Sequence, residues 1–77
     1  MIHRYRRPVL KLYRPDWYDR TRCKVPPDTI VRVVASWGPF RGIETVETPS
    51  IHDACIKGSL IPVPRWAKRR AAFRVVA

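Results

Sequence analysis

Residues 49–73, PSIHDACIKGSLIPVPRWAKRRAAF, decide the predicted fold, because they contain the most definite local signals in the chain. A helix is predicted over residues 50–57: the Ser50 hydroxyl can accept a hydrogen bond from the amide three residues on, while Asp53 reaches back toward Ser50. Gly58 suits the left-handed residue that ends a helix. The apolar face of this helix would consist of Ile51, Ala54 and Cys55.

Two prolines stiffen the segment that follows. Pro62 and Pro64 have no amide hydrogen and a fixed φ, so residues 60–64 are predicted to be extended and to lie at the edge of a sheet. A basic cluster without an acid comes next, at Arg65, Lys68, Arg69 and Arg70. Together with Lys57 and Arg74, these side chains are the expected contacts to phosphate groups.

Three short motifs between residues 48 and 75 form a recognisable pattern. They are Thr48-Pro49-Ser50-Ile51, Ile56-Lys57-Gly58-Ser59-Leu60-Ile61-Pro62, and a basic end with Arg65, Lys68-Arg69-Arg70 and Phe73-Arg74-Val75. The pattern resembles the small excisionase and MerR-like winged-helix proteins. In those families a recognition helix opens on a Ser/Thr-Pro-Ser type of cap, ends in a basic residue and glycine, and runs into a Leu/Ile-Pro strand and a basic wing. Upstream the chain departs from the families, because Arg41 and Thr45 stand where a small residue and a turn glycine are expected, and Glu44 stands at an apolar position.

The resemblance implies a DNA-binding α+β domain of helix-turn-helix or winged-helix type with a short β-hairpin. Its recognition helix would carry Ser50, His52 and Asp53. A single domain over residues 1–77 is expected, because a chain of this length is near the lower end of what one core can hold. The apolar fraction of 45% is enough for a folded core rather than disorder.

Positive charge dominates the composition and is unevenly placed. Sixteen lysines and arginines stand against six acids, a net charge of +10, and most of the basic residues are arginine, which forms paired hydrogen bonds to phosphate. Residues 1–27 hold eight basic and two acidic residues (+6), residues 28–56 hold two and four (−2), and residues 57–77 hold six and none (+6). If the two basic flanks meet in space, they form one face that suits a polyanion.

The N-terminal part is predicted to begin with a flexible basic arm over residues 1–7. The arm would contact phosphates or a minor groove through Arg4, Arg6 and Arg7. Alternating side chains then predict a short strand over residues 9–13. Residues 17–22 follow as a loop or a single helical turn.

Two central segments fit both a helix and a strand. Over residues 28–37, Asp28 can cap a helix and apolar residues recur at helical spacing up to Gly38-Pro39, but the same residues also alternate and are rich in β-branched types. The cap and the stop favour the helix. Residues 40–46 are either the support helix of a helix-turn-helix or one strand of a hairpin that turns at Gly38-Pro39. A strand is predicted over residues 71–76.

No catalytic, metal or cofactor site is expected. His52 and Cys55 lie three residues apart, but neither His3 nor Cys23 completes a recognisable ligand spacing, and the ordinary interpretation is a buried cysteine beside an exposed histidine. Two cysteines are too few for a disulfide framework, which favours reduced thiols in the cytoplasm. No apolar run approaches the length of a membrane span.

The sequence therefore predicts a non-enzymatic DNA-binding protein of phage or mobile-element type, which contacts the phosphate backbone through its arginine and lysine clusters. Two alternatives stay open. One is a small phage-encoded inhibitor or adaptor that docks on a host protein or ribonucleoprotein complex, for which exposure of Trp17 and Trp66 would be evidence. The other is an RNA-binding component, of a ribosome for example. A homodimer is compatible with all three.

Overall fold

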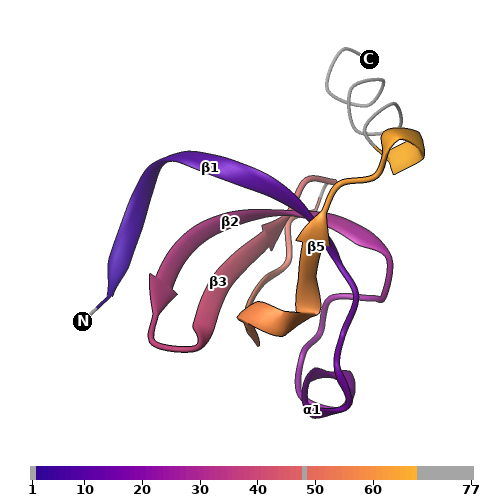
Figure 1. Ribbon diagram of the computed structural model, residues 1–77, viewed down its shortest axis with the longest axis horizontal. Helices are drawn as coiled ribbons and strands as arrows, with labels where there is room; N and C mark the ends of the chain where they lie inside the picture. The colour runs from indigo at the N-terminus through magenta and orange to yellow at the C-terminus, as the bar shows by residue number, and fades with distance from the viewer. Residues whose placement is uncertain (1, 48, 68–77) are drawn as a thin grey trace.

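The computed structural model describes residues 2–47 and 49–67. These residues form a curled antiparallel sheet of five strands in the order β4-β3-β2-β1-β5, a half-barrel. The elements in chain order are β1 (His3–Tyr13), α1 (Trp17–Arg20), β2 (Thr29–Trp37), β3 (Phe40–Thr45), β4 (His52–Ile56), the 3-10 turn η1 (Lys57–Ser59) and β5 (Leu60–Pro62). Figure 1 shows β1 arching over the other strands, with α1 at the opposite end of the molecule.

The predicted helix-turn-helix or winged-helix fold is wrong. Strands account for 52% of the described residues and helical turns for 15%, and the recognition helix predicted over residues 50–57 is instead β4 followed by η1. β4 pairs with β3, with Asp53 opposite Ile43 and Cys55 opposite Arg41. A helix of two turns has little stability of its own, so this pairing with a distant strand outweighs the local helix signals.

The side chains that suggested a helix cap make other hydrogen bonds. The Ser50 hydroxyl donates to the Thr45 carbonyl at 2.9 Å, and the Ile51 amide donates to Thr45 Oγ1 at 2.8 Å, so these groups close the loop between β3 and β4. Asp53 accepts from the backbone amide of Lys24, with Oδ2 at 2.7 Å. Its carboxylate therefore ties β4 to the long loop before β2.

The helix favoured over residues 28–37 is also wrong, and the strand alternative is confirmed as β2. This strand lies between β1 and β3, so both of its edges are paired. β2 and β3 form the hairpin that was the alternative for residues 40–46, with its turn at Gly38-Pro39. Gly38 has a φ of 56°, a left-handed conformation that glycine adopts without strain.

The strands β1 and β5 agree better with the sequence. The strand predicted over residues 9–13 is confirmed as the second half of β1, and the extended edge segment is confirmed as β5, which pairs with β1 at one side of the sheet. The helical turn expected within residues 17–22 is α1. The strand predicted over residues 71–76 lies outside the described residues.

β1 is longer than predicted and changes register part-way along. Arg4 pairs with Ala35 and Val9 with Val33, so the residues between Arg4 and Val9 bulge out of the ladder. Pro8 lies in this bulge and cannot donate to a ladder hydrogen bond. Residues 3–7, which were predicted as an arm, form the first half of this bent strand.

The hydrophobic core lies on the inner face of the curled sheet. It consists of Tyr13, Val25, Val31, Val33, Ile43 and Cys55. The register explains why these residues meet: Val33 lies opposite Ile43 on β3, and the side chains at alternate positions of each strand share a face. Leu12, one residue from Tyr13, is fully buried on the other face of the sheet.

A buried carboxylate fastens α1 across one end of the sheet. Asp19 is only 2% exposed. Its Oδ2 atom accepts hydrogen bonds from the Ile56 amide at 3.1 Å and from the Ser59 hydroxyl at 2.5 Å. The Ser59 oxygen in turn accepts from the Asp16 amide at 3.1 Å. These bonds join α1, the end of β4 and η1 into one unit.

Gly42 offers a test of the packing on the outer face of the hairpin. A Cβ atom at this position would lie 3.3 Å from both the Trp37 ring and the Ala35 Cβ, whereas one at Gly58 would meet nothing within 4 Å. We expect Gly42→Ala to lower the free energy of unfolding by about 1–2 kcal/mol. The matched control Gly58→Ala should be neutral or raise it by about 0.5 kcal/mol. Urea denaturation followed by tryptophan fluorescence measures both, and equal midpoints for the two variants would contradict the packing argument.

Candidate functional site

A hollow on the inner face of the sheet is the best candidate for a binding site. It has a volume of about 370 Å³ and is partly open to solvent. Its lining comes from β1, β2, β3, η1 and β5, namely from Tyr5, Val9, Lys11, Val33, Arg41, Lys57 and Leu60. Three of these residues are basic and none is acidic.

The register of the strands places these side chains on one face. Val9 lies opposite Val33, and Val33 lies opposite Ile43. Lys11 and Arg41 each lie two residues from a member of this row, so their side chains point to the same side of the sheet. Val33 belongs to both the core and the hollow. The hollow is therefore the continuation of the core face toward the bulged half of β1.

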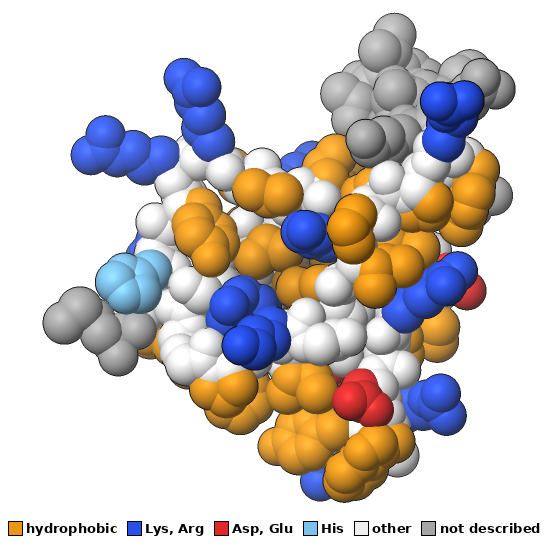
Figure 2. Space-filling model, in the orientation of Figure 1, with side chains coloured by type: hydrophobic (Ala, Val, Ile, Leu, Met, Phe, Trp, Pro, Cys, Tyr) orange, Lys and Arg blue, Asp and Glu red, His pale blue; other side chains and the backbone are white. Residues whose placement is uncertain are grey.

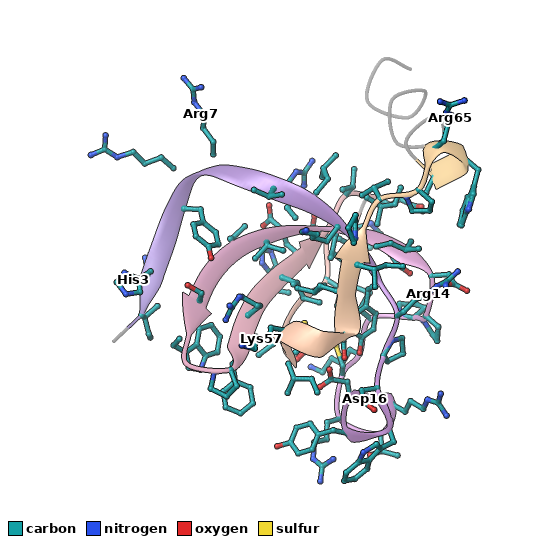
Figure 3. All side chains as sticks on the ribbon, viewed as in Figure 1. His3, Arg7, Arg14, Asp16, Lys57 and Arg65 are labelled. Atoms are coloured by element: carbon teal, nitrogen blue, oxygen red, sulfur yellow. The ribbon has the colours of Figure 1, made fainter. Side chains whose placement is uncertain are left out.

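The lining of the hollow is partly apolar and partly basic. Its aliphatic residues, called the apolar floor below, are Val9, Val33 and Leu60. Figure 2 shows Lys and Arg side chains among hydrophobic ones in the middle of this face, with the visible carboxylates toward its margins. Lys57 lies near the centre of the view in Figure 3, at the turn that leads into β5. Such a surface suits a ligand that is both anionic and partly apolar.

Arg41 is held in place by the hairpin turn. Its Nη1 group donates to the carbonyls of Gly38 at 2.9 Å and Phe40 at 2.7 Å. Within residues 2–47 and 49–67, its Nε and Nη2 groups make no further hydrogen bond, so they are available to an anion. A guanidinium fixed in this way loses little side-chain freedom on binding.

The three basic groups of the hollow are not neutralised by carboxylates of the described chain. Arg14 pairs with Asp28 and Arg32 with Glu44, and the His52 imidazole also lies beside Glu44. Asp16 accepts from the Trp17 amide at 2.7 Å, and the remaining aspartates bond to backbone amides or to Ser59, as described above. None of these pairs includes Lys11, Arg41 or Lys57, and no acidic side chain is among the lining residues of the hollow.

The described residues that were predicted to contact nucleic acid lie in three different places. Lys57 lines the hollow, while Arg4, Arg6 and Arg7 are exposed on the first half of β1, and Arg7 points away from the sheet (Figure 3). Arg65 lies on a helical turn over residues 65–67, which follows β5 along the chain (Figure 3). Lys68, Arg69, Arg70 and Arg74 lie outside the described residues.

The residues assigned to a recognition helix are not brought together on a helix. Ser50 lies in the loop before β4, and the side chains of His52 and Asp53 are on neighbouring strand positions, which face opposite sides of the sheet. His52 is exposed and lies 3.5 Å from Glu44, from Nδ1 to Oε2. Cys55 is 1% exposed, which confirms the interpretation of a buried cysteine beside an exposed histidine.

Tyr5, Lys11 and Arg41 were not predicted as site residues. A signal for two of them was present, because Lys11 alternates with Val9 and Tyr13, and Arg41 with Ile43. A basic residue in register with the apolar positions of a strand points into the inner face rather than to bulk solvent. Sequence alone does not reveal that these two strands flank β2 and that both line one hollow.

A cluster of weak acids lies inside the core next to Asp19. Cys23 and Cys55 are free thiols, and the Tyr13 hydroxyl is buried without a conventional hydrogen-bond partner in the described chain. Burial, with the nearby negative charge of Asp19, raises the pKa of Cys55 to about 12. Burial and the contact with Cys23 likewise raise the pKa of Tyr13, and burial raises that of Cys23.

Neither a metal site nor a membrane span is found in the part of the chain that the structure describes. No group of three or more His, Cys, Asp or Glu side chains there could hold a metal ion. No helix there has the length and apolar character needed to cross a bilayer.

No protein-family model, curated protein or solved structure matches the chain. The resemblance to excisionase and MerR-like proteins therefore stays a prediction from sequence motifs, and the fold that it implied is not the one observed.

Proposed function

We propose that the protein binds nucleic acid through its phosphate groups and catalyses no reaction. The observation that carries the proposal is the hollow on the inner face, where Lys11, Arg41 and Lys57 surround an apolar floor without a carboxylate among the lining residues. A concave surface with one sign of charge concentrates its field and attracts a polyanion. Nucleic acid is the polyanion whose repeated phosphates match several separate basic groups at once.

The charge balance of the whole chain supports a polyanion partner. The net charge is +10, and the acids of the described residues pair with few of the basic ones, notably Arg14 and Arg32. The exposed arginines of β1 extend the positive surface beyond the hollow, through Arg4, Arg6 and Arg7. The free thiols Cys23 and Cys55 fit a reducing compartment, and the cytoplasm is part of this proposal.

Phosphate contacts are favoured over the reading of base sequence in a duplex. The predicted recognition element is a strand, and Ser50 and Asp53 make hydrogen bonds within the protein. A helix or a protruding ribbon that could enter the major groove is not found among the described residues. Affinity would therefore come mainly from lysine and arginine and would depend steeply on salt.

The test is fluorescence anisotropy with labelled duplex DNA, single-stranded DNA and structured RNA, at about 50 and about 200 mM salt. The double variant Lys11→Gln/Lys57→Gln should bind at least about tenfold more weakly at low salt and should lower the salt slope by about 2. The control Arg20→Gln/Lys24→Gln removes the same charge outside the hollow and should have a smaller effect. A third variant, without the charges of Arg65, Lys68, Arg69 and Arg70, tests the predicted C-terminal cluster.

Two results would overturn the proposal. One is the absence of binding to all three nucleic acids at the lower salt concentration. The other is an equal loss of affinity in the hollow variant and its control, which would mean that net charge rather than the hollow determines binding. Circular dichroism of each variant checks that the sheet is intact.

The inhibitor or adaptor hypothesis has one observation in its favour. Trp17 and Trp66 are exposed, at 71% and 50%, and large aromatic side chains are enriched in protein interfaces. Trp17 packs edge-on against Tyr18 on α1, and neither residue lines the hollow. Under this hypothesis Trp17→Ala would abolish the capture of a protein partner, while the nucleic-acid affinity would stay unchanged.

A further inference from the structure

We propose that the hollow binds one unpaired nucleotide of a single strand, with the base against Tyr5 and the apolar floor and the adjoining phosphates on the three basic groups. This inference rests on the proposed function and adds the form of nucleic acid that is preferred. A volume of about 370 Å³ is at the lower end of ligand pockets, which suits one nucleotide rather than a larger ligand.

The apolar part of the hollow has the composition of a base-stacking site. Val9, Val33 and Leu60 form its floor, and the Tyr5 ring lines it from the bulged part of β1. Tyr5 is 40% exposed, so its ring is accessible to a ligand. Every base has an apolar face that can stack on such a ring, so the site would accept bases with little sequence preference.

The basic side chains of the hollow would contact the phosphates on either side of the same base. Arg41 is fixed by its bonds to the hairpin turn, with Nε and Nη2 free of other partners in the described chain, and Lys57 is exposed beside it in the lining. Lys11 lies on β1, two positions from Val9. A base over the floor therefore has basic groups on more than one side for its flanking phosphates.

A duplex cannot place a base in this hollow without breaking a base pair. In a double helix the bases are stacked and paired inside, and only their edges reach the grooves. Extruding one base costs unpairing and unstacking energy, which a single strand does not have to supply. The hollow is partly open to solvent, which leaves room for the neighbouring nucleotides outside it, and the basic residues Arg4 and Arg6 on β1 add positive charge beyond it.

The experiment compares labelled strands of about 12 nucleotides. The probes are oligo(dT), oligo(U), an abasic DNA strand of equal length, a duplex and a mononucleotide. The single strands should bind at least about tenfold more tightly than the duplex, the abasic strand and the mononucleotide at the same salt. Tyr5→Leu should weaken the oligo(dT) complex by about tenfold and leave the abasic complex unchanged, whereas Tyr5→Phe should keep the wild-type affinity.

Each other outcome has a separate meaning. Equal affinity for the abasic strand, or for the duplex, would overturn the single-strand inference while leaving phosphate binding intact. A mononucleotide that binds as tightly as the strand would overturn it in favour of a free-nucleotide site. Loss of binding to every probe at low salt would instead overturn the proposed function itself. Comparison of oligo(dT) with oligo(U) separates DNA from RNA as the preferred strand.

Discussion

Asp19→Ala is expected to lower the free energy of unfolding by about 4 kcal/mol, close to the whole stability of a domain of this size. The carboxylate is 2% exposed, and its Oδ2 atom accepts from both the Ile56 amide and the Ser59 hydroxyl. Alanine would leave both donors without a hydrogen-bond partner, because the site is buried and no equivalent acceptor would replace the carboxylate. Each unsatisfied buried donor costs about 1–3 kcal/mol.

Two further variants separate this effect from a general change in charge. Asp19→Asn keeps an oxygen that can occupy the position of Oδ2, so it should lose less, about 1–2 kcal/mol. Asp28→Asn removes the same charge from an exposed ion pair with Arg14, and asparagine tolerates the φ of 60° at this position, so the change should stay within about 0.5 kcal/mol. Urea denaturation followed by circular dichroism measures all three. A loss for Asp19→Ala no larger than that for Asp28→Asn would show that the carboxylate does not fasten α1 to the sheet.

The sequence predicted those parts of the fold that depend on local chemistry. Pro62 lacks an amide hydrogen and lies on the predicted edge strand, β5, and the Gly38-Pro39 turn of the β2–β3 hairpin was one of the two alternatives for residues 40–46. The second half of β1 was visible in the alternation of its side chains. In each of these cases the deciding property belongs to the residue itself or to its immediate neighbours.

The wrong predictions depend on partners that are distant in the sequence. Residues 28–37 fit both periodicities, and the strand is selected because pairing with β1 and β3 buries Val31 and Val33 together. Asp53 was interpreted as part of a helix cap, but its acceptor capacity is used by the Lys24 amide, 29 positions away. Local cap signals cannot show such a bond, because the competing donor is brought in only by the fold.

The sequence predicted that the candidate site would be basic, but it did not predict most of the residues that form it. Excess arginine and lysine indicated a polyanion partner, and Lys57 is the one residue of the predicted set that lines the hollow in the described part of the chain. The hollow collects residues from position 5 to position 60, and the bulge in β1 that brings in Tyr5 is a property of strand register. Charge composition predicts the class of ligand but not the surface that binds it.

A second large effect is expected at high pH, where the protein should lose stability steeply between about pH 9 and pH 11. The pKa of Cys55 rises from the usual 9.0 to about 12 in the fold, because burial and the nearby Asp19 disfavour the thiolate. When folding raises the pKa of a group, the group contributes fully to the free energy of unfolding at a pH below its pKa in the unfolded chain. This contribution is lost as the pH rises toward the pKa in the folded protein. For Cys55 alone the loss is about 1.4 kcal/mol per pH unit above pH 9, or roughly 3 kcal/mol by pH 11.

Tyr13 and Cys23 act in the same direction, since burial raises the pKa of both, and Tyr13 adds its contribution above the usual pKa of 10.0.

The measurement is a series of urea denaturation curves from pH 7 to pH 11 with a reducing agent present, for the wild type and for Cys55→Ala. The variant will differ in stability at neutral pH, so the comparison is between slopes with pH. Its slope above pH 9 should be smaller by about 1.4 kcal/mol per pH unit, because the thiol of Cys55 no longer contributes to it. Parallel slopes would mean that the thiol of Cys55 ionises in the folded protein as readily as in the unfolded chain, and that the core around Asp19 is not closed to water.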